Sequence, residues 1–413
     1  MTRALSAASL TLLACLAACS SAPTDDLDES PTFAVSSAVI KGKPSDASQD
    51  AVVLLVHYDP QLGEFGQCTG TMLAPRLVLT ARHCVGDTDP YAACTAEGKP
   101  IAAGAIRRNH PADTLYVFTG KNRPDFRRAE DRTPDGQGMK ILDDGAKNLC
   151  NHDIALIVLK EPIEDVPIAP VRLDGDVEVG ELITAVGWGV TDETPQPDVR
   201  QQRKNVKVAT VGPARTAGGV PPNEFEVGES ICSGDSGGPG IAQETNAVVG
   251  VVSRGGNSSA SPDSDDPAAG CIDGRNLYTK ISPFKDLILK GYELAEAEPW
   301  VEGGPDPRKL KPKAACSSGD DCRSGLCLAD PEADNANTCE EDCSATETCT
   351  VEGEICTAEG ASMVCRAPKP PPTAATGAAG GCSSSPVPTG SAIGGGALVF
   401  GLFALASLRR KRA

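Results

Sequence analysis

The residue of this chain best suited to nucleophilic chemistry is a serine that lies among glycines. Ser236 belongs to the run CSGDSGGP, which occupies residues 232–239. Flanking glycines allow a tight turn that exposes the hydroxyl and turns backbone N–H groups toward a developing oxyanion. A short Gly-Asp-Ser run is also common in plain surface turns. The other parts of a catalytic site must therefore be found elsewhere in the chain.

A histidine and an aspartate upstream supply the two groups that would activate such a serine. His83 ends an apolar run in the segment LTARHC, and Asp153 precedes another in NHDIAL. A serine hydroxyl needs a base to accept its proton, and the base needs a carboxylate to hold its tautomer and stabilise the imidazolium. The order His, Asp, Ser therefore predicts an activated serine nucleophile.

With these three motifs the chain resembles the trypsin/chymotrypsin family of serine endopeptidases. The resemblance extends over about 39–296, more than half of the chain. It implies hydrolysis of protein or peptide substrates through an acyl-enzyme, with no metal or cofactor. His83 would deprotonate Ser236, and Asp153 would orient His83. The N–H groups of Gly234 and Ser236 would bind the oxyanion.

The resemblance also assigns a mature amino terminus. Val39 begins the run VIKG, which is similar to the Ile-Val-Gly-Gly start of mature family members, although Lys41 replaces a glycine. The freed Val39 amine would pair with Asp235, and a buried carboxylate needs such a partner. Because Ala38 and not Lys or Arg precedes the junction, the sequence argues against trypsin-like activation and favours self-activation.

A specificity pocket follows from the same resemblance. Cleavage after Lys or Arg relies on an aspartate six residues before the nucleophile, and this position is Ser230. The runs SRG and NLY place Ser253 in the wall, Gly255 at the entrance and Asn276 opposite Ser230. An uncharged base with less volume than a glycine-lined one predicts small or medium uncharged P1 side chains. A shift of one residue would instead turn the carboxylate of Glu229 inward.

The first residues read as an export signal. A short apolar run follows Arg3 and is brief for a membrane span. Cys19, at the end of LAAC, resembles the lipidated cysteine of bacterial lipoproteins, and an ordinary signal peptide is the alternative. At the other end, Cys382, the apolar run 392–408 and the run RRKR resemble the MYXO-CTERM sorting tag of bacterial surface proteins. A plain C-terminal anchor is the alternative, and both readings predict attachment to a bacterial envelope membrane.

Seventeen cysteines in an exported chain indicate disulfides. In the protease-like region the resemblance implies two disulfides that brace the active site, Cys68 with Cys84 and Cys232 with Cys271. Cys94 and Cys150 remain and are expected to form a third. Eight more cysteines lie in 316–365, a segment too poor in large apolar residues for an ordinary core, so four disulfides are expected there. A zinc module is the competing interpretation, but the segment has neither histidine nor a Cys-x2-Cys pair.

Short apolar runs rich in Val, Ile, Leu and Thr predict an all-β fold, and one helix-period stretch occupies 284–296. The resemblance specifies a double antiparallel β-barrel with a C-terminal helix, followed by the disulfide-rich module and a membrane segment. The predicted strands are Ala51–Val56, Arg76–Thr80, Ile154–Leu159, Glu181–Gly187, Ala247–Ser253 and Leu277–Ile281. The predicted divisions are signal peptide 1–18, disordered tether 19–38, protease domain 39–297, linker 298–315, disulfide-rich module 316–366, linker 367–391 and membrane or sorting segment 392–413.

A net charge of −18 argues against nucleic-acid binding. The arginine-rich segment 87–148 is interpreted as a solvated insertion, with an acidic partner as the alternative. Three other histidines, His57, His110 and His152, lack a catalytic sequence context and are interpreted as structural or exposed. The rival function is a catalytically silent surface binding protein, favoured by Arg254, which stands where the family has tryptophan. Oligomeric state is not predicted.

Overall fold

The computed structural model describes residues 39–368, except 129, 192–196, 217–218, 258, 260–263, 265 and 267. The predicted signal peptide, tether, Cys19, Cys382 and terminal apolar run therefore lie outside the described residues. Within the described ranges, no helix has both the length and the apolar character needed to cross a membrane.

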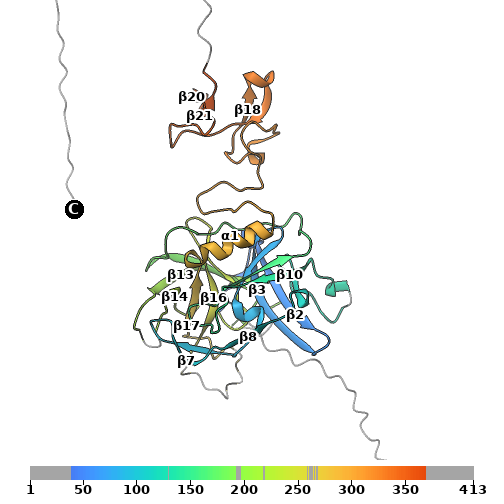
Figure 1. The fold of residues 1–413 in the computed structure, drawn as a ribbon, viewed down its shortest axis with the longest axis vertical. Coiled ribbons are helices and arrows are strands. Elements are labelled where there is room, and N and C mark those ends of the chain that lie inside the picture. Colours follow the sequence, from blue (N-terminus) through green and yellow to red (C-terminus); the bar gives the residue numbers. More distant parts are fainter. Residues whose placement is uncertain are drawn as a thin grey trace, which may run out of the picture. The chain divides into compact units, whose positions relative to one another are not determined.

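The first of two closed six-stranded antiparallel barrels has the strand order β10-β11-β4-β3-β2-β9 (Figure 1). Strands β4 and β11 are buried along their whole length, because their second face is covered by the C-terminal helix and by valines of β16. The strands are β2 (Val52–Asp59), β3 (Glu64–Ala74), β4 (Leu77–Thr80), β9 (Leu115–Phe118), β10 (Gly136–Leu142) and β11 (Ala155–Leu159).

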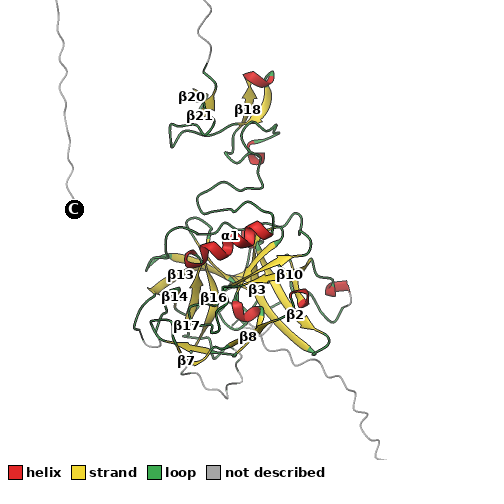
Figure 2. Ribbon diagram, in the orientation of Figure 1, coloured by secondary structure: helices red, strands yellow, loops and turns green. Residues whose placement is uncertain are grey.

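The second barrel has the order β13-β12-β15-β16-β17-β14 and closes through pairing of β13 with β14, while β1 (Lys43–Pro44) adds to β13. Its strands are β12 (Leu182–Gly187), β13 (Gln201–Val211), β14 (Glu224–Val227), β15 (Pro239–Ala242), β16 (Val248–Gly256) and β17 (Arg275–Lys280). The two barrels contact through a small apolar cluster of Val52, Val186 and Ile241. These barrels confirm the predicted fold class, and strands dominate the domain in Figure 2.

One α-helix, α1 (Lys285–Leu294), follows the second barrel. Ile288 and Tyr292 on its predicted apolar face are buried in the core of the first barrel, and Leu287 is half-buried beside them. Gly291 permits this close approach, because a Cβ atom there would lie 2.7 Å from Leu156 Cδ1. The helix therefore fastens the end of the second barrel to the first.

The six predicted strands all overlap observed ones, but the interpretation of 87–148 as a solvated insertion is wrong in part. Strands β9 and β10 lie inside this segment and close the first barrel. The rest includes two antiparallel two-stranded sheets, in which β5 (Gly86–Thr88) pairs with β8 (Ile106–Asn109) and β6 (Ala92–Cys94) with β7 (Pro100–Ala103). Its arginines are largely paired with nearby aspartates: Arg107 contacts Asp87 and Asp89, and Arg127 contacts Asp125.

Disulfides join Cys68 to Cys84, Cys94 to Cys150 and Cys232 to Cys271 in the barrel domain. The chain separates into two compact units after Asp342. Before that point two disulfides hold the hairpin of β18 (Cys327–Asp330) and β19 (Ala336–Cys339); they are Cys316–Cys327 and Cys322–Cys339. After it, two more hold the hairpin of β20 (Ile355–Glu359) and β21 (Ser362–Arg366); they are Cys343–Cys356 and Cys349–Cys365.

Candidate active site

A buried aspartate collects hydrogen bonds from both barrels. Asp153 lies just before β11 and is almost completely buried. The backbone N–H of His83 donates to its Oδ1 over 3.0 Å, and His83 Nδ1 lies 2.8 Å from its Oδ2. From β16 of the second barrel, the hydroxyl of Ser253 donates to the same Oδ2 over 2.6 Å. Three donors thus fix both oxygens of a carboxylate that water does not reach.

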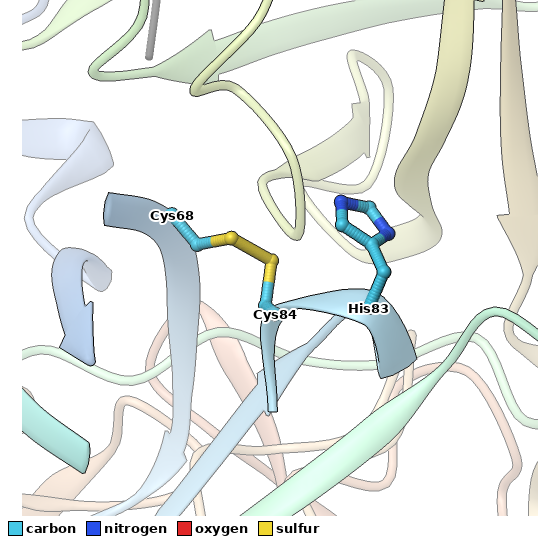
Figure 3. Close-up of side chains that lie close together, drawn as sticks. All are labelled: Cys68, His83 and Cys84. Atoms are coloured by element: carbon cyan, nitrogen blue, oxygen red, sulfur yellow. A yellow bond between two sulfur atoms is a disulfide. The ribbon is translucent and has the colours of Figure 1, made fainter. Parts of the chain in front are cut away.

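His83 lies on a 3-10 turn, Arg82–Cys84, directly after β4. Figure 3 shows its ring beside the Cys68–Cys84 disulfide, which ties this turn to β3. The side chain remains 22% exposed. Its Nδ1 faces Asp153, which leaves Nε2 as the ring nitrogen that could accept a proton.

Burial opposes charge on both groups, but their mutual attraction outweighs it. Burial disfavours the imidazolium, yet the charge and hydrogen bond of Asp153 raise the pKa of His83 above its usual value. Burial likewise disfavours the carboxylate, yet His83, Ser253 and the backbone N–H keep the pKa of Asp153 below its usual value. An ionised aspartate that orients and stabilises a protonatable histidine is the arrangement a general base requires.

Ser236 lies on a turn that both barrels hold in place. Its carbonyl accepts from the N–H of Thr69 in β3 over 2.8 Å, and the Gly237 N–H donates to Val252 of β16 over 2.9 Å. Gly237 has φ +78°, and a Cβ atom there would lie 2.1 Å from the hydroxyl oxygen of Thr80. Gly234, with φ +95°, adopts another conformation that favours glycine. The sequence pattern identified this turn, but not the threonines that support it.

Ser236, Gly234 and His83 line one pocket of about 250 Å³. Residues from the two barrels meet there, because β3 and the His83 turn lie on one side and the Ser236 turn on the other. The three polar residues that the motifs single out are therefore brought together: His83 contacts Asp153, and His83 and Ser236 share a pocket.

Asp235, the neighbour of Ser236, is fully buried and accepts hydrogen bonds from backbone N–H groups. The N–H groups of Cys232 and Gly189 donate to it over 3.0 and 3.1 Å. Within the described part of the chain it forms no ion pair, and burial holds the pKa of its carboxyl well above the usual range. Val39 is also fully buried, and the next N–H, that of Ile40, donates to Ser230 over 3.1 Å.

The residues predicted to form a specificity pocket are tightly packed. Ser230 is fully buried, and Asn276 Nδ2 donates to the Gly228 carbonyl over 3.0 Å. Gly255 pairs with Asn276 across β16 and β17, and a Cβ atom on Gly255 would lie 2.2 Å from Asn276 Oδ1. Asn276 therefore lies directly against the glycine predicted at the entrance.

Two residues considered for this pocket have polar side-chain partners. Ser253, predicted in the wall, has its hydroxyl engaged with Asp153. The carboxylate of Glu229, which a shifted alignment would turn inward, binds Lys41 over 2.8 Å and Arg203 over 3.2 Å. Lys41, where the resemblance leads one to expect glycine, has φ +55° and supplies a partner for Glu229.

Arg254 and Glu224 form an ion pair that the sequence did not reveal. Two nitrogens of Arg254 donate to the two Glu224 oxygens over 2.9 and 2.6 Å, and Glu224 is fully buried. Glu224 also accepts from the N–H of Asn151, two residues before Asp153. Arg254 further donates to Ser253 Oγ over 3.3 Å, which directs the Ser253 proton to Asp153. Through its hydrogen bonds to Asn151 and Ser253, the ion pair helps to hold Asp153 in position. Its only sign in the sequence is an arginine within an apolar strand.

The remaining histidines have other partners. His152, which precedes Asp153 in the sequence, has its Nδ1 2.5 Å from Asp144 Oδ2. His57 and His110 stack on each other and line the same pocket as His83.

Charge changes at the Arg254 and Glu224 pair should move the pKa of His83 in opposite directions. Asp153 and Arg254 are the charged groups that act on His83, and the positive charge of Arg254 lowers its pKa. Arg254→Gln should therefore raise the pKa of His83, and Glu224→Gln, which leaves Arg254 uncompensated, should lower it. Titration by NMR of the four histidines measures both shifts.

Arg275 and Glu226 provide the matched control, since Arg275, from the neighbouring strand β17, also forms an ion pair with a glutamate of β14. Arg275→Gln should leave the pKa of His83 unchanged. Shifts of the same sign in Arg254→Gln and Glu224→Gln would contradict the assignment and indicate a general loosening of the structure.

The barrels and the pocket agree with comparisons to known proteins. A family model described as trypsin matches residues 40–288. The chain is 26% identical over 233 residues to a trypsin of Saccharopolyspora erythraea, an alignment that covers 54% of this chain and 86% of that protein. It is 30% identical over 263 residues to beta-fibrinogenase mucrofibrase-5 of Protobothrops mucrosquamatus, covering 60% and 85%. It is 29% identical over 238 residues to thrombin-like enzyme elegaxobin-1 of Protobothrops elegans, covering 54% and 87%. The chain therefore belongs to the trypsin family of serine proteases.

Proposed function

We propose that the protein is an active serine endopeptidase with Ser236 as nucleophile, His83 as general base and Asp153 as the group that orients it. The observation that carries this proposal is the buried Asp153 carboxylate 2.8 Å from His83 Nδ1, with His83 and Ser236 in one pocket. A binding protein without catalysis would have no need to keep a buried carboxylate against a raised histidine pKa.

In this mechanism His83 takes the Ser236 proton as the oxygen attacks the substrate carbonyl carbon. The carbonyl π-electrons move to oxygen, and the N–H groups of Gly234 and Ser236 bind the resulting oxyanion. Protonated His83 then gives the proton to the leaving amine as the C–N bond breaks, which forms the acyl-enzyme. Water, deprotonated by His83, repeats these steps and restores the Ser236 hydroxyl.

We propose that cleavage before Val39 activates the enzyme through the buried carboxyl group of Asp235. Its carboxylate is buried without an ion-pair partner in the described chain, and burial raises its pKa. Cleavage before Val39 would supply an ammonium group next to the Ile40 N–H that already bonds Ser230. An ion pair with Asp235 would then ionise the carboxylate and stabilise the turn that carries Ser236. The substitution of Ala38 for a basic residue at the junction favours cleavage by the enzyme itself.

The direct test of the nucleophile is Ser236→Ala. Loss of the nucleophile should reduce peptide hydrolysis by about 10⁶-fold and abolish covalent labelling by a fluorophosphonate probe. The unfolding midpoint should change little, because only one oxygen atom is removed. Parental rates of hydrolysis or labelling in this variant would exclude Ser236 as the nucleophile.

We propose that the enzyme prefers small uncharged P1 side chains. Support comes from uncharged Ser230 at the position of the family's aspartate and from Asn276 packed against Gly255. Both features would shorten the pocket and leave a basic side chain without a counter-ion.

Asn276→Gly should therefore enlarge the pocket. The kcat/KM for a Leu P1 substrate, relative to an Ala P1 substrate, should rise at least about tenfold. A peptide library read by mass spectrometry measures the ratio in both proteins. A parental profile dominated by Arg or Lys, or an unchanged ratio in the variant, would refute this assignment of the pocket.

We propose that the exported enzyme is held at a bacterial envelope by its C-terminal segment. The support is the sequence of 392–413, an apolar run followed by basic residues, and the seven disulfides, which need an oxidising compartment. Cleavage before Val39 would free the enzyme from a lipid on Cys19, so the other end must hold it. Deletion of 392–413 should move active enzyme into the medium, as measured by fractionation and labelling. Retention of the truncated mature enzyme at the envelope would contradict this.

A further inference from the structure

Three residues with metal-ligating side chains meet beside the catalytic pocket. His57 lies on β2, Glu64 begins β3, and His110 follows β8. One ligand atom from each lies within 4.8 Å of the others. None of the three belongs to the network of Asp153 and Ser253.

The two imidazoles are held together in a fixed position. Their rings stack with centroids 3.6 Å apart and planes 19° apart. His57 is anchored because its strand pairs with β3 on one side, opposite Gly66, and with β9 on the other, opposite Leu115. His110 is anchored by its N–H, which donates to Val85 over 2.9 Å. Because an imidazole ligates in the plane of its ring, one of the stacked rings must rotate for both to bind a shared ion.

The side chain of His57 is buried with one ring nitrogen that lacks a hydrogen-bond partner among the described residues. The residue is only 7% exposed, and the nitrogen without a partner is Nε2. A buried polar atom without a hydrogen-bond partner is energetically unfavourable. In the tautomer that carries its proton on Nδ1, Nε2 has a free lone pair that can bind a metal ion. A cation would satisfy this atom.

Glu64 completes a donor set suited to a transition metal. Its side chain is 43% exposed, and its Oε2 lies 4.0 Å from His110 Nδ1. Two histidines and a carboxylate are a known ligand set for zinc, with a fourth position left open. Zinc bonds of about 2.0–2.2 Å require the donors to approach one another, and the exposed carboxylate can move to allow this. Cys68 and Cys84 in the same pocket form a disulfide and are not thiolate ligands.

We propose that His57, Glu64 and His110 bind a zinc ion at the edge of the pocket that Ser236 and His83 line, and that the bound ion inhibits hydrolysis. Both histidines line this pocket together with the two catalytic residues. An ion there, with its remaining ligand, occupies space that a substrate needs. The inhibition rests on the proposed peptidase function, whereas the binding of zinc does not.

The test is a zinc titration of the full-length protein after dialysis against a chelator, with binding measured by calorimetry. Cobalt serves as a second probe, and its binding is measured by visible absorption. His110→Gln and Glu64→Gln should each weaken zinc binding at least about tenfold. His152→Gln is the matched control, since His152 pairs with Asp144 outside the cluster, and should bind as the parent does. Circular dichroism checks that each variant is folded, and Glu64→Gln, at a partly exposed side chain, preserves the test if His110→Gln does not fold.

Zinc bound by His83 alone is the main competing outcome. In that case His110→Gln and Glu64→Gln would bind zinc with the parental affinity, and the proposed site would be wrong. The proposed site would also be wrong if the parent bound no zinc. In an active enzyme, zinc should inhibit peptide hydrolysis, a chelator should reverse it, and both ligand variants should need at least about tenfold more zinc. Binding at the site without inhibition would overturn the inhibitory role. An inactive parent that binds zinc at this site would contradict only the peptidase function.

Discussion

The buried carboxylate of Asp153 is the constraint on which the site depends. An isolated carboxylate in this position would be strongly unfavourable, and removing one partner from a buried ion pair typically costs about 3–5 kcal/mol. The chain meets this requirement with His83 from the first barrel and Ser253 from the second. Because the partners belong to different barrels, the site forms only when the barrels are packed together. The apolar contact of Val52 with Val186 and Ile241 holds them in that arrangement.

The second buried carboxyl group, that of Asp235, differs from Asp153 in its partners and in the direction of its pKa shift. Asp153 has a charged partner and a pKa below its usual value, whereas Asp235 has two backbone N–H donors and a raised pKa. Among the described residues, the carboxyl beside Ser236 therefore lacks the charged partner that Asp153 has. A new amino terminus at Val39 would supply such a partner, which links the chemistry of the pocket to a cut in the chain.

The fold was largely predictable, because many of its strands appear in the sequence as short runs of apolar residues. β4 and β11 are continuous apolar runs, since both of their faces are buried. β3 and β13 were missed, because these long strands contain Gly, Gln, Lys and Thr at positions that contact other parts of the domain or solvent. The strands β9 and β10 were hidden in a segment whose arginines and prolines suggested a loop.

The residues proposed as a triad could be singled out from the sequence, because each lies in a compact motif. The supporting residues could not, because they are joined only by tertiary structure. Glu224 and Arg254 are 30 residues apart and meet because β17 pairs with both β14 and β16. His57 and His110 are brought together by β2 and by the segment after β8. No local pattern distinguishes such residues from ordinary charged or buried ones.

The central claim, that Ser236 attacks the substrate with help from His83 and Asp153, is tested most directly by trapping the intermediate. The mature enzyme would be mixed with an activated ester substrate, quenched in acid during turnover, digested and analysed by mass spectrometry. The account predicts one acyl group on the peptide that contains Ser236, and its disappearance when deacylation is allowed to finish. Turnover without an acylated peptide, or acylation at another residue, would contradict it.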